Sequence, residues 1–227
     1  MISKTHNFLY IGIPKTASGS INQAFFDFSD DETLYVNYDT PLGSFKGIKA
    51  HNFEYDLGKH ARLIEYKNKI EPNIYKKLFK FASIRNPWKW AFSYYKAEQL
   101  KKGKDLSKRD FKKHVKICSV MSSYIKLKPV RIGKITGIRR LYHKAPNIAS
   151  IFTGNVDDDI DYIMRVETLQ EDIEKVCEII GIPPVQVPRF NVSPKTDEYK
   201  LFYDDETAQR IFANNYDIIN YANYKFD

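Results

Sequence analysis

The sequence has little of the chemistry that supports secreted or membrane-spanning proteins. It contains two cysteines, Cys118 and Cys177, with no CxxC spacing between them. Such a pair predicts neither a disulfide scaffold nor a zinc site and fits a reducing compartment, so we expect a cytoplasmic protein. The apolar run around Phe8–Ile13 covers only about seven positions, far fewer than a membrane span or a signal peptide needs. We therefore expect no membrane partner.

The chain also lacks the length for two ordinary domains. Its 227 residues are 43% apolar and 15% aromatic, which is enough for one sizeable core. We predict a single domain over residues 1–227. No His, Cys or carboxylate cluster has ligand spacing, so no metal site is expected.

Positive charge is concentrated in one stretch of the chain. Residues 96–144 hold 16 Lys and Arg against three Asp and Glu. One face should therefore be strongly positive, and such a face attracts nucleic acid, anionic membranes or anionic small molecules and glycans. A solvated lysine-rich helix surface explains the same composition equally well. The stretch lacks helix-turn-helix, RNA-recognition and zinc-finger patterns, so we expect no nucleic-acid partner.

Short apolar runs alternate with segments of 3.6-residue periodicity, a pattern typical of alternating strands and helices. We predict strands at Asn7–Ile13, Leu34–Asn37, Phe45–Ala50, Leu78–Ile84 and Asp161–Val166. We predict helices at Ser20–Phe28, after Arg85–Pro87, at Ser107–Val120, after a capping box that begins at Thr168, and at Asp205–Ala222. This order predicts an α/β fold with a mainly parallel central sheet and helices on both faces. Ligands of such sheets bind at the carboxyl ends of the strands.

A tight turn follows the first predicted strand and enters a helix. It consists of Pro14, Lys15, Thr16, Ala17, Ser18, Gly19 and Ser20. Its backbone N–H groups and hydroxyls would converge on an anion, to which Lys15 adds a full charge. The order differs from a Walker A loop, where the lysine stands at the helix start, so the usual ATP or GTP enzymes are disfavoured. An ordinary strand-to-helix turn with capping serines has the same composition.

A second candidate anion cradle follows the strand Leu78–Ile84. It places Arg85 at the carboxyl end of that strand and Ser93 on the helix that follows. Arginine offers a two-pronged donor to a phosphate, and a nearby hydroxyl can donate to a third oxygen. Taken alone, the segment is equally typical of a helix start with a surface arginine.

Together, these segments resemble the PAPS-dependent sulfotransferase family, in particular its carbohydrate branch. Residues 13–20 are similar to the family's I-P-K-T-[AG]-[GS]-[ST]-[ST] loop. Residues 85–95 are similar to its R-[ND]-P-x-x-R-x-x-S-x-Y segment, and residues 165–172 to its R-[FY]-E-x-L-x-x-D segment. Two positions depart from the pattern, because Gly19 stands where Thr or Ser is usual and Trp90 where a second arginine is common.

The resemblance implies a P-loop nucleotide-kinase-like three-layer sandwich. It also implies transfer of a sulfuryl group from 3′-phosphoadenosine 5′-phosphosulfate (PAPS) to a hydroxyl, expected to belong to a carbohydrate. Lys15 would then be catalytic and stabilise charge on the leaving oxygen. The 5′ end of the donor would be held by Pro14, Lys15, Thr16, Ala17, Ser18, Gly19 and Ser20. Its 3′-phosphate would be held by Arg85 and Ser93.

The acceptor hydroxyl needs a general base. His51 directly follows the predicted strand Phe45–Ala50, which we expect to end at the same edge of the sheet as both cradles. In related glycan sulfotransferases a histidine or a glutamate occupies such a position. We therefore assign His51 as the catalytic base, with Glu54 as the alternative. We expect the other histidines to be solvated, namely His6, His60, His114 and His143.

Two other functions fit parts of the sequence. An atypical P-loop kinase for a nucleotide or small molecule would show Mg²⁺-dependent ATP turnover. A non-catalytic nucleic-acid-binding protein would use the basic stretch, but it would not explain Lys15 together with Arg85 and Ser93. The positive stretch favours an acceptor that is itself anionic.

Overall fold

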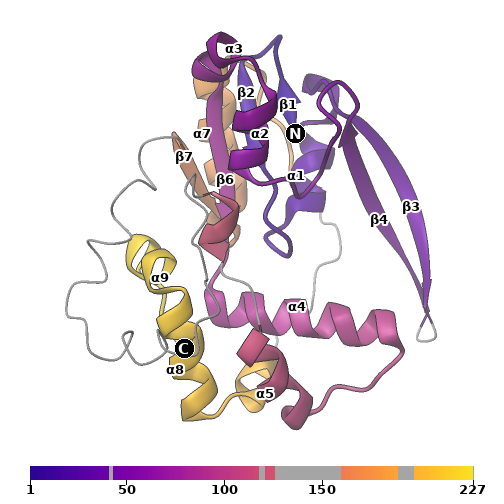
Figure 1. The fold of residues 1–227 in the computed structure, drawn as a ribbon, viewed down its shortest axis with the longest axis vertical. Helices are drawn as coiled ribbons and strands as arrows, with labels where there is room; N and C mark the ends of the chain where they lie inside the picture. The colour runs from indigo at the N-terminus through magenta and orange to yellow at the C-terminus, as the bar shows by residue number, and fades with distance from the viewer. Residues whose placement is uncertain (41–42, 118–120, 126–159, 189–196, 227) are drawn as a thin grey trace.

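A four-stranded sheet runs through the middle of the molecule (Figure 1). The computed structural model describes residues 1–40, 43–117, 121–125, 160–188 and 197–226. The sheet has the order β1-β2-β6-β7, in which β2, β6 and β7 are parallel and β1 is antiparallel to β2. Its strands are β1 (Ile2–Ser3), β2 (Phe8–Ile11), β6 (Phe79–Ile84) and β7 (Tyr162–Arg165).

Both faces of this sheet are buried, because its side chains alternate between two separate cores. Phe8, Tyr10 and Phe81 pack with α1 (Ser18–Ala24) and α7 (Leu169–Ile180). The opposite face, with Leu9 and Ile11, packs in a larger core with six other helices of the described residues. These are α2 (Leu63–Lys69), α3 (Pro72–Lys77), α4 (Pro87–Lys102), α5 (Lys108–Ile117), α8 (Asp205–Asn214) and α9 (Tyr216–Ala222). The predicted three-layer α/β fold is confirmed.

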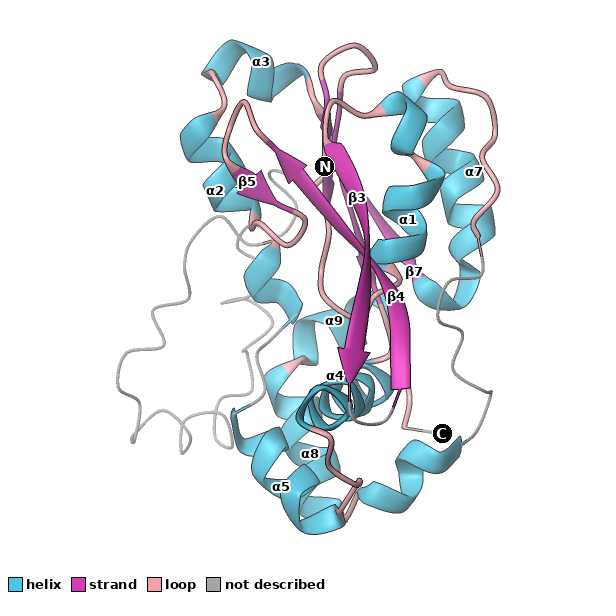
Figure 2. Ribbon diagram, turned by 90° about the vertical axis from the view of Figure 1, so that its right-hand side faces the viewer, coloured by secondary structure: helices cyan, strands magenta, loops and turns pink. Residues whose placement is uncertain are grey.

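A second, antiparallel sheet stands out at the side of the molecule in Figure 1 and runs across its front in Figure 2. It consists of β3 (Glu32–Thr40), β4 (Gly43–Asn52) and β5 (Leu57–Gly58). We expected its two long strands to be short members of the parallel sheet, and this is wrong. Only two residues separate β3 from β4, and so short a connection joins antiparallel neighbours, whereas a parallel crossover needs about a dozen residues.

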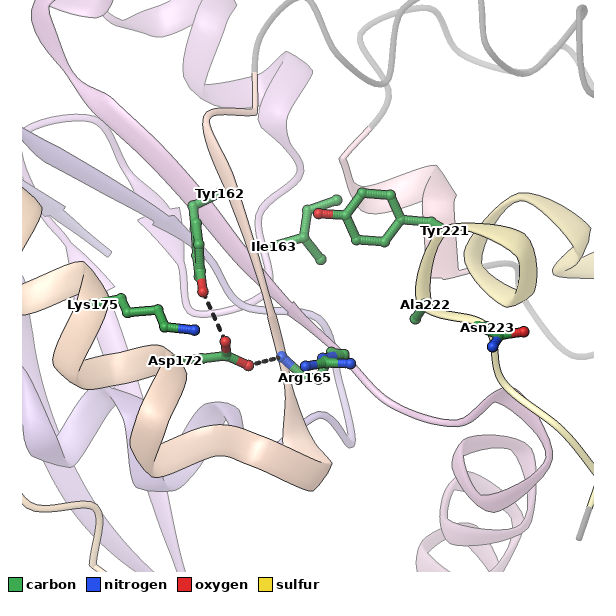
Figure 3. Close-up of a pocket in the computed structure, with 8 residues that line it drawn as sticks. All are labelled: Tyr162, Ile163, Arg165, Asp172, Lys175, Tyr221, Ala222 and Asn223. Carbon is green, nitrogen blue, oxygen red and sulfur yellow. Dashed lines mark hydrogen bonds between the residues drawn. The ribbon is translucent and has the colours of Figure 1, made fainter.

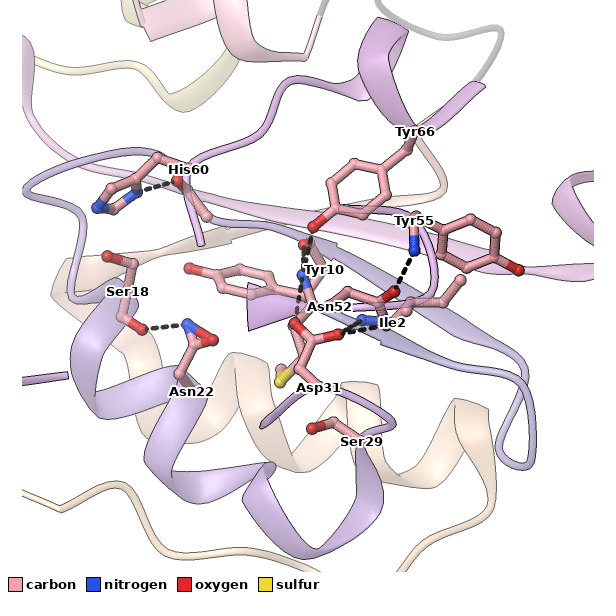
Figure 4. Close-up of polar contacts among 12 residues, drawn as sticks. Ile2, Tyr10, Ser18, Asn22, Ser29, Asp31, Asn52, Tyr55, His60 and Tyr66 are labelled. Atoms are coloured by element: carbon pink, nitrogen blue, oxygen red, sulfur yellow. Dashed lines mark hydrogen bonds and ion pairs between the residues drawn. The ribbon is translucent and has the colours of Figure 1, made fainter. Parts of the chain in front are cut away.

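A buried carboxylate joins the two sheets (Figure 4). Asp31, just before β3, accepts hydrogen bonds from the backbone N–H of Ile2 in β1 at 3.1 Å and from the Asn52 side chain in β4 at 3.1 Å. The N-terminal ammonium group lies 3.5 Å from the same carboxylate. Because an unpaired buried charge is costly, these contacts fix the base of the β3–β4 hairpin against the central sheet.

The helix boundaries differ from the prediction in three places. The first helix begins earlier, at Ser18, and passes into the 3₁₀ turn η1 (Phe26–Phe28). The last predicted helix is two helices, α8 and α9, which meet at Asn215. Thr168 forms no capping box, since its hydroxyl donates to Asp172 at 2.8 Å. The described residues also form the 3₁₀ turns η2 (Met121–Tyr124), η4 (Val166–Thr168) and η5 (Asp197–Phe202).

Two helix signals in the sequence are confirmed. Ser107 accepts from the backbone N–H of Asp110 at 3.1 Å at the start of α5. Gly181 ends α7 with a left-handed φ of 71°. Of the basic stretch 96–144, residues 118–120 and 126–144 lie outside the described residues. No helix in the described ranges is long and apolar enough to cross a membrane.

Candidate active site

The residues after β2 form the first predicted cradle. A Cβ atom on Gly12 would lie 2.5 Å from the carbonyl oxygen of Lys59, so only glycine lets the Lys59 segment pass this close. Further along, Lys15 and Ala17 have φ values of 67° and 61°. Left-handed conformations of residues other than glycine cost roughly 1–2 kcal/mol each, and they cluster at binding and catalytic sites.

Buried hydrogen bonds hold this strained loop in place. The hydroxyl of Thr16 lies 2.8 Å from the Ile13 carbonyl and 2.8 Å from the Ser83 hydroxyl of β6. Ser83 in turn donates to the Thr16 carbonyl at 2.9 Å. From α4, the indole N–H of Trp90 donates to the Pro14 carbonyl at 2.7 Å. The Thr16 hydroxyl is therefore used inside the protein, where it positions the loop, and Trp90 fixes the loop to α4.

The loop presents unused donors where α1 begins. Ala17 is the N-cap of α1 and has no side-chain group that could accept from the first N–H groups of the helix. Among the described residues, the hydroxyls of Ser18 and Ser20 have no hydrogen-bond partner. Space around Gly19 is open, since no heavy atom lies within 4 Å of a Cβ built there. An anion could thus approach the start of α1 closely.

The second cradle lies at the end of the neighbouring strand β6. Arg85 follows β6 directly and is half-buried. Asn86 is the N-cap of α4, and its backbone N–H donates to Glu167 at 2.9 Å while its side chain donates to the Lys225 carbonyl at 2.9 Å. These contacts fix the junction of β6 and α4, from which Arg85 projects.

One face of α4 is directed at the first loop. Trp90 contacts Pro14, and Ser93 and Lys101 follow Trp90 at spacings of three and eleven residues, which places them on the same side of the helix. Ser93 is partly exposed, and its hydroxyl has no partner within the described part of the chain. The charge of Lys101 lowers the pKa of Lys15, so the last turn of α4 also lies near the loop.

The two cradles share a region of positive charge. Burial lowers the pKa of Lys15, and the charges of Arg85 and Lys101 lower it further. Burial, with the charges of Lys15 and Lys101, lowers the pKa of Lys59 to about 8. In the described ranges, no carboxylate lies within ion-pair distance of Lys15. Burial lowers the pKa of Arg85, and the nearby charge of Glu167 partly opposes this shift. Half-buried cations that repel one another would gain most from a bound anion.

No metal site emerges from the same region. Within the residues that the structure describes, no group of three or more His, Cys, Asp or Glu side chains is arranged to hold a metal ion.

His60 is exposed, as expected, and it also lies against the first loop. Its Nδ1 atom is 2.6 Å from the carbonyl oxygen of Gly12 (Figure 4). A carbonyl oxygen only accepts, so in the neutral ring Nδ1 carries the proton and Nε2 has a lone pair available. Surrounding protein atoms, and then the charge of Lys59, lower the pKa of His60 to about 4. The contact joins positions 48 residues apart, which no local sequence signal reveals.

His51 does not lie where the sequence placed it. It belongs to β4 of the antiparallel sheet, where it pairs with Glu32, so it is not at the carboxyl edge of the parallel sheet. Its neighbours Ala50 and Asn52 are buried, and alternation along the strand turns His51 to the opposite face. There its Nε2 atom lies 3.2 Å from the exposed carboxylate of Asp56. The reason given for its catalytic role is therefore wrong.

Glu54, the alternative base, lies far along the sheet from Lys15. Its carboxylate forms an ion pair with Lys4, which directly follows β1. Because Ser3 in β1 pairs with Phe8, Lys4 lies near the amino end of β2, whereas Lys15 follows the carboxyl end. This position does not suit a base that must act beside Lys15.

Comparisons with known proteins give the family of the chain. A protein-family model described as the Sulfotransferase family matches residues 1–219. Neither the search of curated proteins nor the search of solved structures gives a match. The match includes both cradles and almost the whole of the chain. The chain thus belongs to the sulfotransferase family, and its chemistry is that of a transferase of sulfuryl groups.

Proposed function

We propose that this sulfotransferase takes its sulfuryl group from PAPS and transfers it to a carbohydrate hydroxyl, with residues 1–227 acting as a single domain. The observation that carries the proposal is the pair of adjacent cradles, in which Lys15 has only cations as its charged neighbours. Lys15 and Arg85 follow the neighbouring parallel strands β2 and β6. Neighbouring strands are about 5 Å apart, so one nucleotide with phosphates at both ends can contact both cradles.

The chain's own groups suit the two ends of this donor. Ser18, Ser20 and the backbone from Pro14 to Ser20 would hold the 5′ end, since the Ser18 and Ser20 hydroxyls and the first N–H groups of α1 have no competing partner. Arg85 and Ser93 would hold the 3′-phosphate, so the enzyme would bind PAPS in preference to ATP. When bound, PAPS supplies an activated sulfuryl group whose leaving group is a phosphate.

Lys15 would act on the bond that breaks. As negative charge develops on the oxygen that bridges phosphorus and sulfur, the Lys15 ammonium group would stabilise it. Because that charge is largest in the transition state, the contact lowers the barrier more than it strengthens donor binding. The strain at Lys15 fits this role, since a left-handed backbone aims the side chain in a direction that an ordinary turn would not.

His60 is the better candidate for the base. Its Nε2 atom has an available lone pair, and its ring lies against Gly12, three positions before Lys15. It would take the proton of the acceptor hydroxyl as that oxygen bonds to sulfur. His51 remains the base predicted from the sequence, and comparison of the two alanine variants decides between them.

The carbohydrate acceptor is supported by the resemblance to the carbohydrate branch. Lys59 and Lys101 supply positive charge next to His60, because both lower its pKa. An acceptor that reaches His60 therefore enters a positive environment, which favours a sugar that already carries a carboxylate or a sulfate.

The decisive assay is transfer of labelled sulfate from PAPS to a panel of neutral and acidic saccharides, with metal ions removed by EDTA. We expect labelled product with at least one saccharide, and faster transfer to acidic members at low salt. Phosphate transfer from ATP in Mg²⁺, with no product from PAPS, would replace this proposal with the kinase alternative.

A further inference from the structure

A cavity lies beside β7, and neither Lys15 nor Arg85 lines it (Figure 3). Its volume is about 370 Å³, and it is bounded by β7, α7 and the end of α9. The lining residues are Tyr162, Ile163, Arg165, Asp172, Lys175, Tyr221, Ala222 and Asn223. No role in the proposed transfer has been given to any of them.

The carboxylate in the wall is already occupied. Asp172 is buried and accepts hydrogen bonds from the hydroxyl of Tyr162 at 2.7 Å, the backbone N–H of Arg165 at 2.8 Å and the hydroxyl of Thr168 at 2.8 Å (Figure 3). These three donors fix the start of α7 against β7. They also satisfy the hydrogen-bonding capacity of the carboxylate, which keeps its negative charge beside the two cations of the cavity.

Two cations that line the cavity have no ion-pair partner among the described residues. Arg165 and Lys175 are exposed, and within the described ranges neither has a carboxylate within ion-pair distance. Arg165 pairs in register with Ile84, the residue before Arg85. The cavity is therefore one strand farther along the same carboxyl edge as the two cradles, and its lining holds two cations and one carboxylate.

An aromatic side chain lies opposite these cations. Tyr221 projects from α9 with 58% of its surface exposed. Beyond it, Asn223 ends α9 in a left-handed conformation and contributes an amide to the cavity wall. An exposed tyrosine ring packs well against the C–H face of a sugar and is polar at its tip. Cations on one side and a flat aromatic surface on the other suit a sugar ring that carries an oxyanion.

We propose that Arg165 and Lys175 form a further anion-binding subsite, which takes a phosphate or sulfate ester carried on a sugar ring that packs against Tyr221. The subsite deepens the proposed function and rests on it for the source of the ester. Two sources share this chemistry, namely the 3′-phosphate end of the donor and a sulfate of the acceptor saccharide. The guanidinium of Arg165 would bind two ester oxygens side by side, and Lys175 would add a point charge.

The experiment compares the wild type with the Arg165→Ala/Lys175→Ala double variant by calorimetry. The probes are adenosine 3′,5′-bisphosphate, adenosine 5′-monophosphate, a sulfated disaccharide and its desulfated counterpart. A Lys76→Ala/Lys77→Ala double variant removes two exposed cations from α3, at the amino end of β6, and serves as the matched control. Circular dichroism and thermal unfolding confirm that all three proteins are folded.

We expect the Arg165→Ala/Lys175→Ala variant to bind at least one sulfated or phosphorylated probe tenfold or more weakly, while the control binds like the wild type. A loss confined to the bisphosphate identifies the donor as the source, and a loss confined to the sulfated disaccharide identifies the acceptor. Unchanged affinity for both probes, equal losses in the control, or no binding of either probe to the wild type overturns the subsite. Failure of the bisphosphate alone to bind the wild type counts against the proposed function, and the disaccharide then decides the subsite.

Discussion

At the amino end of the central sheet Lys80 is buried with partners, whereas at the carboxyl end Lys15 is half-buried among other cations. Lys80 donates to the Leu78 carbonyl at 2.7 Å, lies 3.7 Å from the carboxylate of Asp161 and sits over the ring of Tyr75. Lys15 has Arg85 and Lys101 as its charged neighbours. A lysine that stabilises the fold is compensated, and a lysine kept for an external anion is not.

The largest expected effect follows from replacing the uncompensated lysine. Lys15→Ala should lower the rate of sulfuryl transfer by about 10²–10³, as loss of a preorganised charge at a developing anion does in other enzymes. Its thermal stability should equal or exceed that of the wild type, because a repelled buried charge is removed. A transfer assay and a thermal unfolding curve measure the two effects. Wild-type turnover in this variant would contradict the proposed role of Lys15.

The next largest effect distinguishes His60 from His51 as the general base. His60→Ala should lower turnover by about 10²–10⁴, the range for loss of a general base, while His51→Ala should change it less than threefold. Initial rates at saturating donor are the measurement. A larger loss of turnover in His51→Ala than in His60→Ala would identify His51 as the base, as the sequence predicted.

Lys80, the compensated lysine, should matter for stability and not for turnover, which is the opposite of Lys15. Lys80→Ala should lower the free energy of unfolding by about 2 kcal/mol, because packing and an ion pair are lost, with turnover of the folded fraction unchanged. Denaturant unfolding checks this, with the exposed Lys77→Ala as the control. Loss of turnover in fully folded Lys80→Ala protein would show that Lys80 also serves the reaction, which contradicts the contrast with Lys15.

The smallest effect is a pH dependence at Lys59, whose pKa is about 8 in the free protein. Affinity for adenosine 3′,5′-bisphosphate should fall a few-fold as the pH rises from 7 to 9, because the ammonium group is lost. Stability should change in the opposite direction. A lysine with a lowered folded-state pKa binds fewer protons than in the unfolded chain, so stability increases between its folded and unfolded pKa values. Lys59→Met should flatten both profiles, and unaltered profiles would exclude Lys59 as the titrating group.

Local sequence patterns were sufficient to predict much of the fold and the positions of both cradles in the chain. Each cradle is a continuous strand, turn and helix, so Lys15 and Arg85 could be placed from sequence alone. The same holds for the Ser107 cap and the Gly181 helix end. These features depend on neighbours within a few positions, which periodicity and capping rules describe.

Contacts between distant segments were not predictable in this way. His60 reaches Gly12 across 48 positions, and the Thr16 hydroxyl is used by Ser83, 67 positions away. His51 was predicted to lie at the carboxyl edge of the parallel sheet, but β4 pairs antiparallel with β3. This pairing depends on the register of the hairpin and cannot be read from the apolar pattern of β4. Side chains that a motif offers to a ligand can thus be used by the fold instead.

The most direct test is calorimetric binding of adenosine 3′,5′-bisphosphate, in EDTA, to the wild type and to the Lys15→Ala and Arg85→Ala variants. Two cradles that share one nucleotide predict metal-independent binding to the wild type and a loss of tenfold or more in each variant. They also predict that Arg85→Ala no longer distinguishes the bisphosphate from adenosine 5′-monophosphate. Wild-type affinity in both variants would show that the nucleotide does not contact both cradles, which contradicts the account.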